Sequence, residues 1–163
     1  MIAKVLVSRC LLGERVRYDG QASGDWGLLR AWQAEGRVVP LCPEVAGGLP
    51  TPRPPAEIQG GQGIEVLRGE TRIIASTGAD VTAPFLSGAR LALALVEAHG
   101  IQAAVLKANS PSCGNEQTYD GSFSGRKVAG EGVTAALLTQ HGVKVFNEGQ
   151  LADAQAFLEA MIG

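Results

Sequence analysis

Short apolar segments rich in β-branched residues alternate along this chain with segments whose apolar residues have helical spacing. The expected strands are 2–7, 37–41, 101–106 and 143–146, and the expected helices are 25–35, 80–99, 132–140 and 149–161. Such an alternation is typical of a parallel sheet that is covered by helices on both faces. We therefore predict an α/β fold, a single three-layer domain over residues 1–163 with a mainly parallel sheet.

Three further segments do not fit the alternation. Residues 43–55 hold five prolines, a density that neither a helix nor an interior strand tolerates, so we expect an ordered loop there. Residues 64–67 and 71–75 flank Arg68-Gly69-Glu70 and predict a small hairpin. A second, looser hairpin is expected over 116–123, turning at Asp120-Gly121.

Composition excludes several classes of partner. The net charge of −2 and the aromatic content of 5% argue against a protein that binds nucleic acid. The longest apolar stretch, 91–96, is far shorter than a membrane span, so no membrane contact is expected. The start of the chain has no secretory pattern, and the cysteines are few and widely spaced, which favours a cytoplasmic protein.

All three cysteines of the chain follow expected strands. Cys10 comes after the strand 2–7, Cys42 directly follows 37–41, and Cys113 comes after 101–106. The ligand crevice of an open parallel sheet lies beyond the carboxyl ends of its strands, so the fold would bring these thiols to one edge. The alternative for any single one of them is an ordinary buried cysteine that packs as a small hydrophobe.

Three thiolates would suit a soft metal centre, which could be zinc, copper(I) or an iron–sulfur cluster. A structural zinc site normally has four protein ligands, and the fourth would have to be a carboxylate or one of the two histidines. His99 and His141 both precede a glycine in the pattern of a helix end. Three thiolates without a fourth ligand therefore suggest a centre with one open position, where a substrate can bind.

Several motifs in the same order resemble the thiouracil desulfurase family across nearly the whole chain. They are CLLG at 10–13, VRYDG at 16–20, PLCPE at 40–44, GGLPTPR at 47–53, LK at 106–107, SPSCG at 110–114, GSF at 121–123 and GVT at 132–134. The resemblance implies a [4Fe-4S] cluster held by Cys10, Cys42 and Cys113, with one iron free to take the sulfur of the substrate. It also implies hydrolytic, non-redox conversion of a small thiolated pyrimidine, such as 2-thiouracil, to uracil and sulfide.

Two residues are candidates for the proton transfers of such a reaction. Glu44 lies two residues beyond Cys42, where nearby thiolates and a partly dry site should raise its pKa and suit it to act as a base. Its alternative is a solvated loop carboxylate or a helix cap. Ser110 could donate a proton to the leaving sulfur or to a ring nitrogen, or it could simply hydrogen-bond the backbone of its turn.

Further candidates flank the cysteine loops. Arg17, Tyr18 and Asp19 could bind a pyrimidine edge, or an Arg–Asp pair could hold the loop, and Ser112 is a candidate for substrate contact with a structural alternative. Arg53 stands between prolines and could close its loop by pairing with a carboxylate, or face water.

Two other functions remain open from the sequence. One is a cluster enzyme that acts on thiolated nucleosides or nucleotides. The other is a non-enzymatic module that binds a metal or sulfide.

Overall fold

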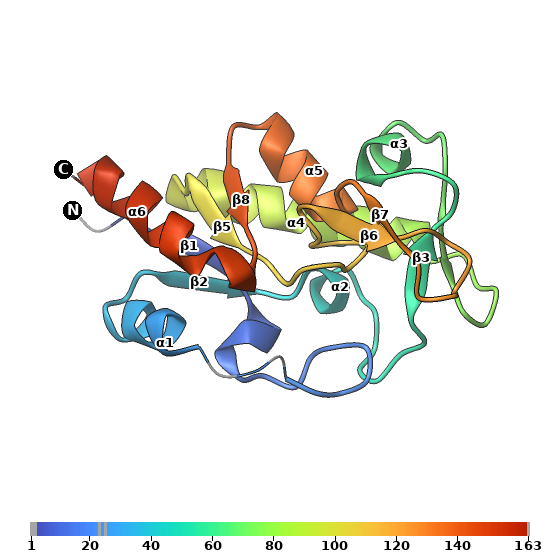
Figure 1. Cartoon of the computed structure of the whole chain (residues 1–163), viewed down its shortest axis with the longest axis horizontal. Helices are drawn as coiled ribbons and strands as arrows, with labels where there is room; N and C mark the ends of the chain where they lie inside the picture. The colour runs from blue at the N-terminus through green and yellow to red at the C-terminus, as the bar shows by residue number, and fades with distance from the viewer. Residues whose placement is uncertain (1–2, 23, 25, 163) are drawn as a thin grey trace.

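The computed structural model describes residues 3–22, 24 and 26–162 (Figure 1). Its centre is a four-stranded parallel sheet in the order β2-β1-β5-β8. The strands are β1 (Val5–Ser8), β2 (Val38–Leu41), β5 (Ala103–Val105) and β8 (Lys144–Phe146). The predicted α/β fold is confirmed, with each strand a little shorter than expected; residues 1 and 2 of the first expected strand lie outside the described part.

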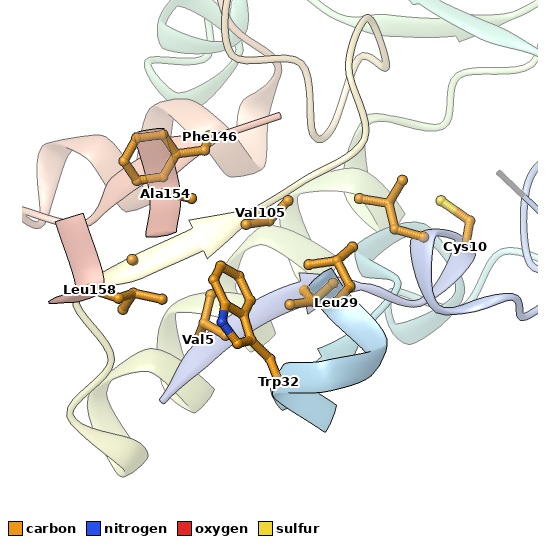
Figure 2. Packing of buried hydrophobic residues seen from close by; sticks show 11 residues of the cluster. Val5, Cys10, Leu29, Trp32, Val105, Phe146, Ala154 and Leu158 are labelled. Atoms are coloured by element: carbon orange, nitrogen blue, oxygen red, sulfur yellow. The ribbon is translucent and has the colours of Figure 1, made fainter. Parts of the chain in front are cut away.

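Helices cover both faces of this sheet. The long helices are α1 (Gly27–Ala34), α4 (Thr82–His99), α5 (Val133–Gln140) and α6 (Leu151–Ile162). In β1, Val5 and Val7 pack toward α1 and α6, whereas Leu6 packs toward α4 and α5 (Figure 2). This alternation buries every residue of β1, as a central parallel strand requires. No helix within the described residues has the length and apolar content needed to cross a bilayer.

The expected hairpin over 64–75 is wrong. Its first half is the helix α3 (Gly63–Leu67), which begins with a capping box between Gln62 and Glu65. Its second half contains β4 (Ile73–Ala75), which pairs antiparallel with β3 (Ala56–Ile58) instead. The reciprocal cap satisfies backbone N–H groups at the start of the helix, a signal that outweighs the β-branched residues of the segment.

The proline-rich segment begins with a short helix rather than with a loop. Pro43 occupies the first turn of α2 (Pro43–Ala46), where its missing N–H costs nothing. This helix lies directly on α4, since a Cβ at Gly47 would stand 2.0 Å from the Pro84 carbonyl oxygen. A Cβ at Gly88 would stand 1.9 Å from the Pro43 carbonyl oxygen, so only glycine permits this contact from either side.

The second expected hairpin is present but longer than predicted. Its strands are β6 (Gln117–Tyr119) and β7 (Lys127–Ala129), joined by the loop 120–126. Figure 1 shows this hairpin beside β3. Two single turns of 3-10 helix complete the fold, η1 (Arg9–Leu12) and η2 (Glu148–Gln150).

Candidate metal centre

Three neighbouring strands deliver the three cysteines to one place. Cys10 lies in η1 directly after β1, Cys42 is the residue between β2 and α2, and Cys113 lies in the loop that follows β5. Because β2, β1 and β5 are adjacent and parallel, their carboxyl ends meet at one edge of the sheet. From β1 the chain adds β2 on one side of the sheet and later adds β5 on the other side. Open α/β sheets bind ligands at such a change in the direction of strand order.

All three cysteines line one cavity of about 300 Å³. Cys10 and Cys113 are buried and Cys42 is half-buried, and all three thiols are free. Figure 2 shows Cys10 at the margin of its hydrophobic cluster, beyond Leu29. Their position in the cavity wall separates these cysteines from ordinary core residues. The cavity wall also includes Ser8, Arg17, Tyr18, Glu44, Arg53, Glu57, Lys107, Ser110 and Tyr119.

Burial disfavours the ionised form of all three thiols. It raises the pKa of Cys10 to about 12, and the negative charge of Cys42 adds to the effect. Burial likewise raises the pKa of Cys113, where the Ser8 hydroxyl donates to Sγ over 3.8 Å and opposes the shift. Burial also raises the pKa of Cys42, and hydrogen bonds from two backbone N–H groups of α2 oppose this shift. A metal group that binds here must therefore displace the thiol protons.

The donor set suits a group larger than one ion. Within residues 3–22, 24 and 26–162, no three side chains of His, Cys, Asp or Glu are grouped so that they could hold a metal ion. The arrangement of the described residues therefore does not favour the closed tetrahedral zinc site that the sequence left open. Three cysteines in the wall of one cavity are the kind of ligand that an iron–sulfur cluster takes.

Glu44 lies in the same cavity wall, paired with Arg53. Arg53 Nε donates to Glu44 Oε1 over 3.1 Å, and the two side chains are only 5% and 17% exposed. Burial raises the pKa of Glu44, whereas the charge of Arg53 and the hydroxyl of Ser110 lower it. The expected direction of the shift is present, but its largest cause is burial rather than neighbouring thiolates. The expected pairing of Arg53 with a carboxylate is also present.

Arg53 itself is held rigidly. Its guanidinium donates to the carbonyl oxygens of Pro50 and Val16 and to the Thr51 hydroxyl, at 3.1 to 3.2 Å. These bonds fix the direction of the Arg53 fork and, through it, the carboxylate of Glu44. Charge-assisted hydrogen bonds are stronger than neutral ones, so this arrangement holds the Glu44 carboxylate in the cavity wall.

Ser110 connects Glu44 to the loop of Cys113. Its Oγ donates to Glu44 Oε2 over 3.5 Å and accepts the backbone N–H groups of Ser112 and Cys113 at 2.9 and 2.8 Å. The turn contact, one of the two alternatives from the sequence, is therefore present, and the role of Ser110 as a proton donor to the substrate stays a prediction. The Ser110 hydroxyl forms the turn, and its proton points toward the carboxylate.

The structure does not bring Ser112 and Asp19 to the cavity wall. Ser112 is fully buried, and its hydroxyl shares a hydrogen bond of 2.6 Å with the Thr134 hydroxyl in α5. The Asp19 carboxylate accepts the Gln21 backbone N–H over 3.0 Å and lies 3.9 Å from Arg17 in a weak ion pair. Arg17 and Tyr18, by contrast, line the cavity.

Sequence reasoning missed Ser8 and Glu148, whereas Lys107 was a candidate either for pairing with a carboxylate or for facing water. Ser8 donates to Cys113 and accepts the Lys107 backbone N–H over 3.1 Å, which ties β1 to the loop after β5. The Lys107 ammonium lies 2.8 Å from Glu148, a residue 41 positions later at the start of η2. Ser8 is the last residue of a strand that leads to a cysteine, which was a usable signal. Nothing in the sequence pairs Lys107 with Glu148.

Comparison with known proteins finds relatives over most of the chain. A family model described as 2-thiouracil desulfurase matches residues 5–150. A solved structure of the [4Fe-4S]-dependent thiouracil desulfidase TudS is 52% identical, with a TM-score of 0.89 over 97% of this chain and 99% of that chain. The uncharacterized protein YbbK of Bacillus subtilis (strain 168) is 46% identical over 149 residues, which cover 91% of this chain and 98% of YbbK.

Proposed function

This chain belongs to the 2-thiouracil desulfurase family, and we propose that this [4Fe-4S]-dependent thiouracil desulfidase works by hydrolysis rather than by redox chemistry. In the balanced reaction, the oxygen of water replaces sulfur on the ring carbon, and sulfur leaves as sulfide with the protons of that water. No oxidant or reductant is consumed. The observation that supports the proposal best is that three thiols and the Glu44–Ser110 pair line one cavity.

We assign Cys10, Cys42 and Cys113 as the residues that hold the cluster. When it is bound, the cluster supplies a soft Lewis acid for the thiocarbonyl sulfur of the substrate. The three strands position the thiols before any metal arrives, because β2, β1 and β5 are registered by their backbone ladders. Ser8 orients the Cys113 sulfur through its hydroxyl.

Glu44 is the group that takes the proton of the attacking water. Its carboxylate is held by Arg53 on one oxygen and receives the Ser110 hydroxyl on the other. Ser110 gives this carboxylate a path for the proton toward the leaving sulfur. A base that is positioned by a rigid partner contributes through orientation as well as through proton affinity.

We assign to this enzyme a small-molecule substrate and a location in the cytoplasm. A cavity of about 300 Å³ suits a single pyrimidine ring, and a chain of net charge −2 lacks the field that attracts polyanions. Arg17 and Tyr18 are the cavity residues that we assign to the edge of the ring. Three free cysteines with no disulfide suit a reducing compartment.

The test is turnover of 2-thiouracil by protein that is reconstituted without oxygen. We expect about four irons per chain, the content of a [4Fe-4S] cluster, and equal amounts of uracil and sulfide. In water labelled with oxygen-18, the label should appear in uracil. A requirement for an added reductant, or uracil without the label, would contradict hydrolysis.

Glu44→Gln tests the assigned base. This variant keeps the shape of the side chain, so we expect unchanged iron content and a kcat that is about 10² to 10⁴ lower. The matched control is Glu35→Gln, which changes an exposed carboxylate paired with Arg37 outside the cavity and should leave kcat unchanged. Full turnover by Glu44→Gln would exclude Glu44 as the base.

A further inference from the structure

The loop 120–126 contains a phenylalanine in an unusual conformation. Phe123 has a φ of +57°, in the left-handed region that bulky side chains rarely adopt. Its side chain is 39% exposed and belongs to none of the hydrophobic clusters of the described residues. Core packing therefore does not explain why an aromatic residue, rather than glycine, occupies this position. Strained positions of this kind concentrate at functional sites.

The backbone of Phe123 is tied to the cavity wall. The carboxylate of Glu57, which is buried and lines the cavity, accepts the N–H groups of Gly121 and Phe123 at 2.9 and 3.2 Å on one oxygen. The loop also touches β3 directly, because a Cβ at Gly121 would lie 2.7 Å from the Ile58 carbonyl oxygen. Tyr119, just before the loop, lines the cavity as well.

The backbone of Phe123 is thus bound to a residue of the cavity wall, and an exposed aromatic residue held there has a use in the proposed reaction. The substrate is a planar ring with two apolar faces, and stacking on an aromatic side chain fixes such a ring without restricting its polar edges. Phe123 and Tyr18 are the two aromatic residues among the large exposed hydrophobic residues of the described chain. Tyr18 already lies in the cavity wall.

We propose that Phe123 is a specificity-determining residue that closes over the face of the pyrimidine, and that Glu57 is the positioning residue that holds it there. This inference rests on the proposed function, since it names the residue that receives the substrate ring. The loop stays docked through Gly121 while the ring of Phe123 contacts the ligand. Glu57 acts through the backbone of the loop.

The decisive variant is Phe123→Gly in the cluster-loaded protein. Glycine adopts a φ of +57° without strain, so the variant should unfold at the same temperature as the wild type or higher. We expect KM for 2-thiouracil to rise about tenfold, the effect of one lost stacking contact, with kcat within about twofold. Phe123→Tyr should restore KM, and Leu91→Ala, at an exposed position of α4, should leave it unchanged.

Binding of uracil measures the same contact without turnover. Uracil presents the ring without the sulfur, so its dissociation constant, measured by calorimetry on the cluster-loaded protein, should rise by the same factor in Phe123→Gly. Unchanged values of KM and of uracil affinity would overturn the proposal, as would a loss of stability with both values intact. Absence of turnover in the wild type would instead contradict the proposed function, and uracil binding would still decide the role of Phe123.

A double-mutant cycle tests Glu57. Glu57→Ala removes the acceptor of both loop N–H groups, so KM should rise as in Phe123→Gly, whereas Glu57→Gln keeps an acceptor oxygen and should stay near the wild type. If Glu57 acts through Phe123, the double variant should be no worse than the poorer single variant. Additive effects would assign Glu57 a separate contact with the substrate.

Discussion

At the scale of single residues, one hydroxyl joins the parts of the site. Ser110 lies in the turn before Cys113, accepts two backbone N–H groups of that turn and donates to Glu44. Ser112, two residues later, has its hydroxyl bound to Thr134 beneath the site. The two serines flank the same proline, yet one faces the cavity and the other faces the core. Their substitution should therefore have different consequences.

Ser110→Ala should lower kcat by about 10² or more, because the proton path from Glu44 is lost. Ser112→Ala leaves the Thr134 hydroxyl buried without its partner, so it should lower the free energy of unfolding by about 1 to 3 kcal/mol. Its kcat per bound cluster should stay within about twofold of the wild type. Anaerobic steady-state kinetics and urea unfolding measure both effects, and a large fall in kcat for Ser112→Ala would show that Ser112 takes part in the chemistry.

At the scale of elements, the position of α2 depends on two glycines. This helix follows Cys42 and carries Glu44, and it approaches α4 so closely that Gly47 and Gly88 leave no room for a side chain. The backbone contact sets how far the thiol and the carboxylate extend into the cavity. A small displacement of α2 would therefore move two functional groups together.

Gly88→Ala should separate α2 from α4, because its Cβ would collide with the backbone of Pro43. We expect loss of at least about 2 kcal/mol of stability, the scale of overpacking, and a lower iron content after reconstitution. The control is Gly27→Ala in α1, where no atom lies within 4 Å of the added Cβ and the same substitution should be neutral or slightly stabilising. Equal behaviour of the two variants would contradict the role of this contact.

The start of α4 offers a pH-dependent test. Asp80 accepts the Thr82 N–H and pairs with Arg72, and these contacts lower its pKa to about 2. Because the pKa of Asp80 is lower in the folded state, its carboxylate stabilises the fold at pH values above the pKa of the unfolded state, about 3.9. This contribution is lost as the pH falls toward 2. Asp80→Ala should therefore lower Tm by a constant amount between pH 7 and 5, and the difference should shrink below pH 4. Calorimetric scans against pH that show no such convergence would contradict the assignment.

At the scale of the whole molecule, the candidate metal centre lies at the margin of the core, because Cys10 and Cys113 each belong to a hydrophobic cluster. The four-stranded sheet is buried between clusters of aliphatic and aromatic residues on its two faces, and the cysteines lie at its carboxyl edge. Apolar side chains of the helices bury the sheet on both faces. The cluster should therefore add stability to a chain that is already folded.

Removal of the cluster by a chelator should lower Tm, because a group that binds the folded form stabilises it by mass action. The far-ultraviolet circular dichroism at 25 °C should remain that of an α/β protein. Reconstitution should restore the original Tm. The Cys113→Ser variant should bind less iron, and its Tm should rise less on reconstitution. Loss of secondary structure on chelation would instead mean that the metal nucleates the fold.

Local patterns were sufficient for the sheet and for the cysteines. The strand segments are short, apolar and rich in β-branched residues, so these features and the flanking turns identified all four parallel strands. The position of a cysteine after each of three strands predicted that the three thiols meet at one edge of the sheet. The same local reasoning failed at 64–67, where a reciprocal cap outweighed strand propensity.

The sequence by itself determined the order of the four parallel strands and of the long helices, the three thiols and the neighbourhood of Glu44. Only the tertiary structure decided that Arg53 pairs with Glu44, that Ser112 faces α5, and that Glu57 reaches a loop 64 residues away. The physical reason is distance along the chain. Periodicity and turn chemistry act over a few residues, whereas these partners meet only after the sheet, α2 and the β6–β7 hairpin have packed together.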